Sequence, residues 1–328
     1  MNALRSLLVR TAWPGLLAGS MWLTWALWSR GMSAFTAFVF GYCALVVVVV
    51  AVERLIPRTP DWFDSDGQEA NDVFFTVGTQ FLFSSAAGAV LKFATTAVLV
   101  AVAGLSDVAI WPRHWPMWSQ VAIALCLVDG CRYWGHRLSH TTELFWRAHS
   151  LHHSAKRIWV LNTGRMHPLD NLPLLFSGIV IPLVGMPPEV VVFQAAFTAF
   201  VGLMAHSNIR LRLGALNYIF NTPVLHRWHH SNVVAESNHN YAHTLALWDL
   251  VFRSYHNPHD AIPEVLGIPQ PFPDGILEQL KYPFTGWPLA VDRWPWSPSS
   301  ANGQQPTAND HNRQPQPAPI ATDQVSTA

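Results

Sequence analysis

The apolar run FTAFVFGYCALVVVVVAV, within residues 34–52, constrains the fold of this chain more than any other segment. A helix crosses a bilayer with about 20 apolar residues, at a rise of about 1.5 Å each. Further apolar runs cover residues 13–28, 74–105, 117–133 and 172–205. Charged residues make up only 12% of the chain, against about 25% in a soluble domain. We therefore expect an all-α, polytopic membrane helical bundle.

Two of these runs do not look like single helices. The run 172–205 is better explained as a helical hairpin, because it contains the helix breakers Pro182, Gly185, Pro187 and Pro188. The run 74–105 is too long for one crossing and short for two. A single helix would place Lys92 near the middle of the membrane, which is costly. A turn around residues 88–92, or a partly re-entrant segment, would relieve that cost.

The distribution of Lys and Arg predicts the orientation in the membrane. Segments 1–14, 53–71 and 136–170 carry 2, 2 and 5 of these residues, whereas the loops near Arg30 and Arg113 carry one each. The positive-inside rule therefore favours a cytoplasmic N-terminus and a cytoplasmic segment 136–170. This requires an even number of crossings before His136. A hairpin at Lys92 would give five crossings, which conflicts with this requirement. We give the charge count more weight than the hairpin.

The chain divides into four expected parts. Residues 1–71 form membrane anchor helices and a linker, because no cleavage site of small residues follows the first apolar run. Residues 72–260 form a catalytic domain, and 261–296 an aromatic C-terminal extension. Residues 297–328, rich in Pro, Gln, Asn and Ser, are expected to be disordered. Three dispersed cysteines do not suggest a disulfide framework, and a net charge of zero gives no sign of nucleic-acid binding.

Fifteen of the 16 histidines lie between His114 and His259, and eight of them form three groups. Residues at i, i+3 and i+4 share one face of a helix, so each group presents several imidazoles together. Imidazole suits iron, zinc, copper or nickel. Eight imidazoles are too many for one ion, so the pattern predicts two metals. The groups are His136-x3-His140, His149-x2-His152-His153 and His226-x2-His229-His230.

Further candidates surround these groups. His167 and His206 flank the run 172–205 and would return to the same membrane face if that run is a hairpin. His239 is a weaker candidate ligand and His243 weaker still, whereas exposed loop positions are expected for His114, His256, His259 and His311. Ligand histidines usually donate their second N–H to a carboxylate or carbonyl. Candidates for such support are Asp129, Asp170, Asn208 and Asp249, although Asp129 could equally pair with Arg132 and Asp249 could be a cap or turn residue.

The motifs together resemble the fatty acid hydroxylase / sterol desaturase superfamily, in particular its bacterial members. They are, in order, DGCRYWGHRLSH, LFWRAHSLHHS, RMHPLD, AHSN, TPVLHRWHHS and NYAHTLALWDLVF, from Asp129 to Phe252. The resemblance implies a membrane-embedded helical fold in the bacterial inner membrane, with a cytoplasm-facing di-iron cap. It also implies O2-dependent oxidation of lipid C–H bonds, by hydroxylation or desaturation. The eight grouped histidines match the family's metal ligands, and His167 and His206 match further histidines.

Two departures from the family pattern concern the last motif. Many members have glycine where this chain has Ala242, which adds a Cβ. Many also have Phe-Gly-Thr where this chain has Phe252-Arg253-Ser254. Both departures leave the eight grouped histidines in place. They reduce what can be said of the substrate, which could be a sterol, a fatty acyl chain or an isoprenoid.

The electrons for such a reaction have no visible source within the chain. No G-x-G-x-x-G fingerprint follows a strand, and the cysteine spacing does not match an iron–sulfur domain. We expect an external reductase, ferredoxin or cytochrome as partner. Two other functions stay open: a metal transporter, whose histidines should line a pathway within the spans, and a non-catalytic metal-binding scaffold.

Overall fold

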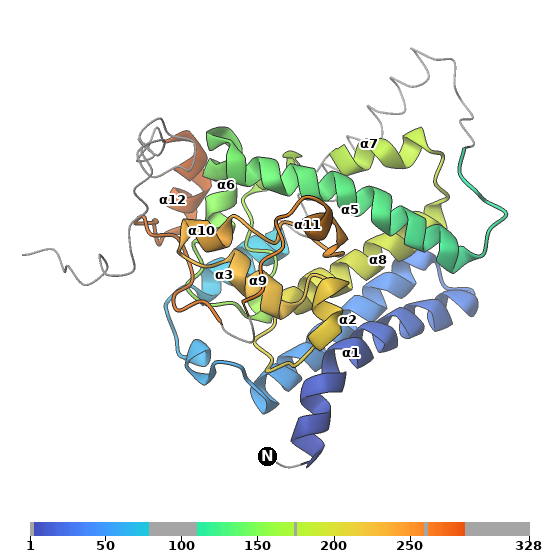
Figure 1. Cartoon of the computed structure of the whole chain (residues 1–328), viewed down its shortest axis with the longest axis horizontal. Coiled ribbons are helices and arrows are strands. Elements are labelled where there is room, and N and C mark those ends of the chain that lie inside the picture. The colour runs from blue at the N-terminus through green and yellow to red at the C-terminus, as the bar shows by residue number, and fades with distance from the viewer. Residues whose placement is uncertain (1–2, 79–109, 174–175, 259–261, 286–328) are drawn as a thin grey trace, which may run out of the picture. The chain divides into compact units, whose positions relative to one another are not determined.

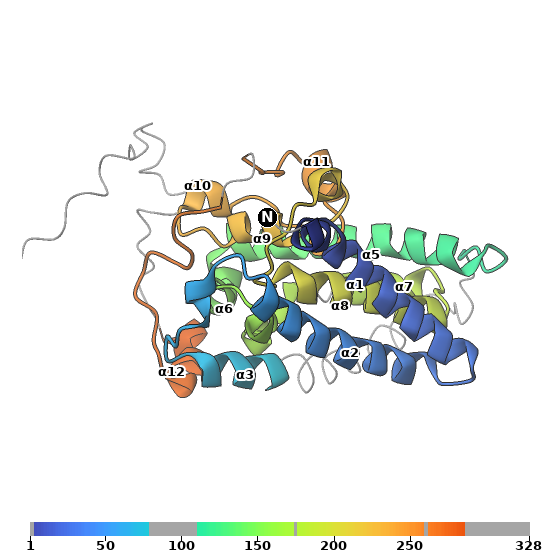
Figure 2. The same cartoon turned by 90° about the horizontal axis from the view of Figure 1, so that it is seen from below.

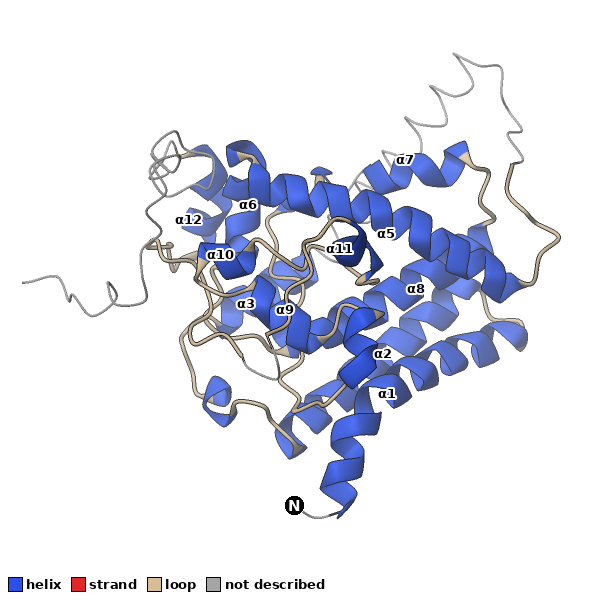
Figure 3. Cartoon of the chain, in the orientation of Figure 1, coloured by secondary structure: helices blue, strands red, loops and turns tan. Residues whose placement is uncertain are grey.

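The computed structural model describes residues 3–78, 110–173, 176–258 and 262–285, and these residues are helical or irregular (Figure 3). Within them the extended pairing is limited to three isolated bridges, such as Pro57 with Ile209, and no strand is formed. The all-α prediction is therefore confirmed for this part of the chain. Residues up to Thr285 belong to one compact unit. The predicted disordered tail and the last part of the aromatic extension lie outside the described residues.

Four long helices form the body of this unit. They are α1 (Ala3–Ser29), α2 (Ala34–Leu55), α5 (Met117–Thr141) and α8 (Pro188–Ala205). Helix α8 packs against the other three and lies between α2 and α5 (Figures 1 and 2). Its Phe193 and Phe200 are fully buried, and the Trp28 ring meets Phe193 edge-on at 5.3 Å. The apolar sequence of α8 is thus explained by its central position.

Helix α2 has the properties of a membrane-facing helix. It leaves Phe35, Phe40 and Val47 exposed by 65%, 57% and 69%, which would be costly in water for so apolar a helix. Among the described helices, α2 and α8 are long and apolar enough to cross a membrane. Helix α8 is half covered by its neighbours, whereas most of α2 is not. The number of crossings stays a prediction.

The break predicted within residues 172–205 is confirmed. Helix α7 (Phe176–Leu183) ends before a turn in which Gly185 has a φ of 66°, a conformation that glycine adopts without strain. Helix α8 then begins with Pro188, where the missing amide proton costs nothing. Both helices pack against α5. Most of the ambiguous run 74–105 lies outside the described residues.

In Figure 1 the start of α1 and the ends of α2, α8 and α5 lie on the left side of the helical body, with the start of α1 at the bottom and the end of α5 at the top. The Arg212 amide donates to the Val9 carbonyl at 2.9 Å, and Glu53 accepts the amides of Asn208 and Val160 at 2.6 and 3.0 Å. Helix α5 starts at the opposite end and returns the chain here. The three segments rich in Lys and Arg therefore lie on this side of the helical body, and the side of the membrane that they face stays a prediction.

Short helices and loops form a cap at this end. The elements are η1 (Pro60–Phe63), α3 (Glu69–Val77), α6 (Glu143–His153), η3 (Val160–Asn162), η4 (Pro168–Asn171), η6 (Gly214–Tyr218), α9 (Pro223–His229), α10 (Val234–Ser237), α11 (Leu247–Val251), α12 (Ile276–Lys281) and η7 (Tyr282–Phe284). Buried charges fix α3 to the segment after α6. Asp72 accepts from Arg165 at 2.7 Å and from the Trp159 indole at 2.9 Å. Nine of the described histidines lie within this cap or at the helix ends that adjoin it.

Candidate metal centre

Nine buried histidines gather into two adjacent groups. In group A, the candidate ligand nitrogens of five histidines lie within 4.8 Å of one another, and in group B the same holds for four. No exposed fraction in either group exceeds 7%. Group A consists of His136, His140, His149, His153 and His229, and group B of His152, His206, His226 and His230.

The two HxxHH motifs contribute to both groups, because of helical geometry. On α6, His149 and His153 are four residues apart and point together into group A, while His152 points into group B. The second motif, on α9, does the reverse. Its His226 and His230 enter group B, and His229 enters group A. Each triplet therefore bridges the two groups, and the His153 and His230 rings stack at 4.4 Å where the groups meet.

The remaining ligand positions come from the ends of long helices. His136 and His140 lie four residues apart near the end of α5, so both enter group A from one face. His206 is the residue at which α8 ends, and its Nε2 lies 2.8 Å from that of His226. The structure thus adds His206 to the eight grouped histidines that the sequence singles out.

The spacing of the nitrogens fits metal coordination. Within group A, the Nε2 of His136 lies 3.1 Å from that of His149 and 3.0 Å from that of His229. Within group B, the Nε2 of His230 lies 3.1 Å from those of His152 and His226. Two imidazoles bound to one ion at about 2.05 Å are about 2.9 Å apart at a right angle and about 3.3 Å apart at a tetrahedral angle. The observed spacings of 3.0 and 3.1 Å fall between these two values.

Hydrogen bonds at the other ring nitrogen orient four of these histidines. The Nδ1–H of His149 donates to Asp170, and that of His136 donates to the Tyr241 carbonyl at 2.6 Å. His229 donates to the His239 carbonyl at 2.7 Å. His206 lies 3.1 Å from the Asn162 side-chain oxygen. Such partners fix the tautomer, so that Nε2 presents its lone pair to an ion.

Burial favours the neutral form of five of these imidazoles. For His152, His153, His226, His229 and His230 the pKa lies well below 6.5, first because burial disfavours the charged form and second because neighbouring imidazoles repel it. A neutral imidazole is the form that binds a metal. The chemistry of this donor set and its spacing therefore both fit two bound ions.

Two candidate ligands from the sequence lie outside both groups. The Nε2–H of His167 donates to the Leu280 carbonyl and its Nδ1 accepts the Leu169 amide, so both nitrogens are used. The His239 ring lies against His256 at 5.0 Å, and only its backbone carbonyl supports the centre. Both ends of the hairpin reach the cap as expected, but only His206 joins a histidine group, since His167 caps η4 outside both groups. We leave both residues out of the ligand set.

The other histidines are placed as follows. The His243 ring packs 4.9 Å from that of His136 without joining group A. His114 contacts Trp115 at the far end of the body. His256 lies against His239 and is only partly buried. The last two, His259 and His311, fall outside the described residues.

The four candidate supporting residues have different roles. Asp170 contacts a ligand histidine directly. Asp249 acts one step away, because it accepts the amides of Tyr241 and Ala242 at 2.8 and 3.0 Å and so fixes the peptide whose carbonyl holds His136. Asp129 accepts the amides of Thr244 and Leu245 instead of pairing with a histidine. The Asn208 side chain accepts the Thr59 amide and donates to the Thr59 carbonyl.

Sequence reasoning missed three of the orienting groups. Two are the backbone carbonyls of Tyr241 and His239, which leave no signal in side-chain identity. The third is Asn162, whose amide also bonds the Arg157 carbonyl at 2.8 Å and shapes η3. At the two departures from the family pattern, Ala242 is buried and its amide donates to Asp249, and exposed Arg253 adopts a φ of 59°.

Comparisons with known proteins agree with this site. The model of the fatty acid hydroxylase family matches residues 121–254, which include all nine histidines. The chain is 38% identical to ornithine lipid hydroxylase of Rhizobium tropici over 83% of each chain. It is 27% identical to alkylglycerol monooxygenase of Danio rerio, over 53% of this chain and 38% of that one. It is 31% identical to methylsterol monooxygenase 1 of Rattus norvegicus, over 43% of this chain and 49% of that one.

No solved structure matches the chain. The full-length relative and the family model agree on the histidine-bearing region, and the relatives they name are lipid hydroxylases and monooxygenases. On this evidence the chain is an oxidoreductase that belongs to the fatty acid hydroxylase / sterol desaturase superfamily.

Proposed function

We propose that this protein is a membrane-embedded di-iron enzyme that uses O2 to hydroxylate or desaturate a lipid. The observation that carries the proposal is the splitting of the two HxxHH motifs, which builds two adjacent, fully buried imidazole groups from three helices and a helix end. Hydroxylation and desaturation begin with removal of the same kind of hydrogen, so the ligands alone do not separate them.

Iron fits the donor set better than zinc. A structural zinc takes four ligands and a catalytic zinc usually three plus water, whereas group A offers five imidazoles. The cysteines are absent from both groups. Bound iron would supply the one-electron chemistry needed to activate O2.

The protein's own residues hold and shield this chemistry. Asp170, the Tyr241 carbonyl, the His239 carbonyl and Asn162 orient the ligand rings. Burial of every ring excludes bulk water, which limits unproductive release of reactive oxygen. The Trp146 ring packs 5.2 Å from His140 and covers one side of group A.

We further propose that this end of the helical body faces the cytoplasm of a bacterial inner membrane. The segments rich in Lys and Arg gather here, as the positive-inside rule requires. A cytoplasmic centre would be within reach of a separate reductase, ferredoxin or cytochrome, which the reaction needs. The position of the ligands at the end of the helices, and not along them, argues against a metal transporter.

Among lipids, we favour a polar membrane lipid of the ornithine-lipid type. The ornithine lipid hydroxylase matches over 83% of both chains, whereas the matches to the alkylglycerol and methylsterol enzymes span half or less of those proteins.

The test compares the lipids of cells that express the wild-type protein with cells that express His206→Ala, under isotopically labelled O2. We expect a lipid that gains one labelled oxygen, or loses two hydrogens, only with the wild type. His167→Ala serves as the matched control and should make the same product as the wild type. Identical lipids in all three strains, with all proteins present in the membrane, would refute the proposed activity.

A further inference from the structure

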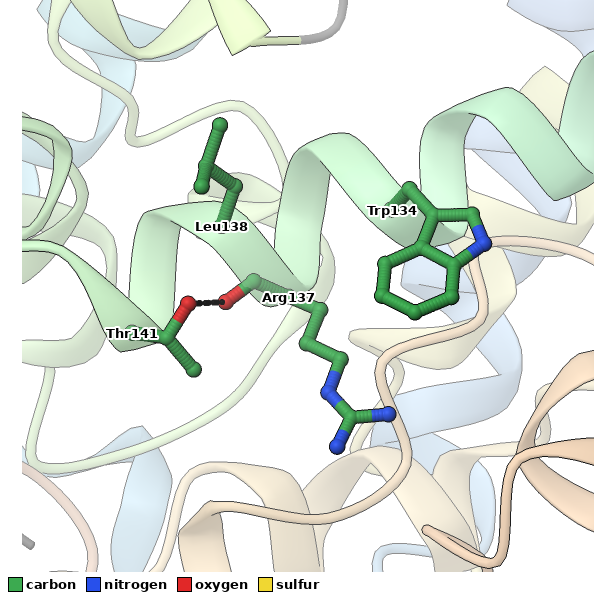
Figure 4. A pocket seen from close by; sticks show the side chains of 4 residues that line it. All are labelled: Trp134, Arg137, Leu138 and Thr141. Carbon is green, nitrogen blue, oxygen red and sulfur yellow. Dashed lines mark hydrogen bonds between the residues drawn. The ribbon is translucent and has the colours of Figure 1, made fainter.

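A hollow on the outer face of α5 lies directly beside the metal centre. It has a volume of about 230 Å³ and is lined by Trp134, Arg137, Leu138 and Thr141. Figure 4 shows the Trp134 and Arg137 side chains projecting from the same side of the helix, with the Thr141 hydroxyl donating to the Arg137 carbonyl. Arg137 stands between His136 and His140 in the sequence of α5.

The cation in this hollow forms no ion pair among the described residues, and the nearest carboxylate charge that acts on it belongs to the buried Asp249. Its guanidinium donates to the neutral Tyr133 hydroxyl at 3.0 Å, and it lies over the Trp134 ring at 5.5 Å and the Tyr241 ring at 5.9 Å. The nearby Arg147, by contrast, forms an ion pair with Glu143 one helical turn away. A partly exposed guanidinium framed by aromatic rings can still form a bidentate contact with a phosphate or carboxylate.

The surroundings of the hollow resemble a membrane boundary. One face of α5 exposes Leu127 by 40% and Trp134, seven residues later, by 51%, before the polar Thr141. Helix α11 adjoins this face, because Phe252 lies 4.8 Å from Trp134. It exposes Leu250 and Val251 by 42% and 56%. Tryptophan favours the interface between hydrocarbon and water, and arginine keeps its charged end at that level.

We propose that this hollow binds the anionic group of a membrane lipid headgroup, a phosphate or a carboxylate, and presents that lipid to the metal centre. The claim that the bound lipid is the substrate rests on the proposed function. The claim that a lipid binds at Arg137 is independent of it. The Tyr241 ring connects the hollow to group A, since it lies 5.9 Å from the Arg137 guanidinium and 5.2 Å from the His140 ring. The headgroup would therefore sit one aromatic ring away from a metal ligand.

The experiment measures lipid retention by the iron-loaded, detergent-solubilised protein in native mass spectrometry. The probes are phosphatidylglycerol, diacylglycerol and inorganic phosphate. We expect Arg137→Gln to retain phosphatidylglycerol about tenfold less well than the wild type, with bound iron and diacylglycerol retention unchanged. Arg147→Gln, which removes a nearby charge that is already paired, should retain phosphatidylglycerol like the wild type.

Two further variants separate charge from structure. Arg137→Lys should recover most of the retention, because it keeps the charge. Tyr133→Phe removes the hydroxyl that Arg137 contacts but not the cation, and should bind phosphatidylglycerol like the wild type. Equal retention by Arg137→Gln and Arg147→Gln would overturn the proposal, and so would displacement of the lipid by inorganic phosphate at equal concentration, which would indicate a site for the free anion. Because the readout is binding, a failure here is distinct from a failure to oxidise any lipid.

Discussion

The Nδ1–H of His149 donates to the carboxylate of Asp170, and both carboxylate oxygens lie 2.9 Å from that nitrogen. Both side chains are only 2% exposed. A carboxylate in this position fixes the tautomer of the imidazole and increases its basicity as a ligand. Asp170 is the only one of the candidate carboxylates that contacts a ligand ring in the part of the chain the structure describes.

Replacing Asp170 by Asn should weaken iron binding at group A by about 10- to 100-fold, the usual effect of losing such a partner. The measurement is the iron retained after dialysis against a graded series of chelator concentrations. Glu143→Gln, which breaks an exposed ion pair with Arg147, is the control and should behave like the wild type. Unchanged iron retention in Asp170→Asn would show that the hydrogen bond does not support the ligand.

The metal-free protein should lose stability as the pH falls below about 6.5. The folded state holds His152, His153 and His230, among others, at a pKa well below 6.5, whereas the unfolded chain takes up protons near pH 6.5. The unfolded state therefore binds more protons in this window, and each such histidine lowers stability by up to about 1.4 kcal/mol per pH unit. Above pH 7 this contribution vanishes. A melting temperature of the metal-free protein that stays constant from pH 7.5 to about 5.5 would contradict this linkage.

Arg253→Gly should stabilise the protein. Arg253 is exposed and has a φ of 59°, a left-handed conformation that costs about 1–2 kcal/mol for a residue with a Cβ. Glycine removes this cost but adds about 0.4–1 kcal/mol of unfolded-state entropy, so a net gain of about 0.5–1 kcal/mol is expected. Thermal denaturation checks it. Arg253→Ala keeps the Cβ and should show no such gain, and an equal gain in both variants would mean that strain is not the cause.

Gly130→Ala should destabilise the contact between α5 and α11. An added Cβ would lie 2.7 Å from the Trp248 ring, which is well inside contact distance, and overpacking of this kind costs about 1–3 kcal/mol. The control is Gly19→Ala in α1, where nothing lies within 4 Å of the new Cβ and alanine favours the helix. Thermal denaturation in one detergent should therefore move in opposite directions for the two variants. A neutral Gly130→Ala would show that α11 can move away from α5.

The sequence was informative where spacing alone determines geometry. Histidines at i and i+4 must share a helical face, so the three motifs could be recognised before the fold was known. Spacing did not reveal that the middle histidine of each triplet joins a different group from its two neighbours, as His152 and His229 do. That division depends on how α6 and α9 face each other. His167 shows the same limit: its ring turns to the Leu280 carbonyl, a contact between segments 113 residues apart that no local pattern contains.

The fold was predictable in its helices and less so in its arrangement. Pro182, Gly185 and Pro188 marked the break between α7 and α8 because backbone chemistry acts locally. The central position of α8 between α2 and α5 depends on packing, and the apolar sequences of α2 and α8 are too similar to tell the lipid-facing helix from the covered one. The position of Asp249 near the histidines in sequence indicated a supporting role. The sequence did not indicate that Asp249 acts by binding the backbone amides at Tyr241.

The iron content of single-histidine variants tests the two-ion account most directly. The wild type, reconstituted with iron(II) and freed of excess metal, should bind about two ions per chain. His149→Ala in group A and His206→Ala in group B should each approach one, while His167→Ala and His239→Ala should remain at about two. One ion in the wild type, or equal loss of iron from the group variants and from His167→Ala, would contradict a centre built from these two imidazole groups.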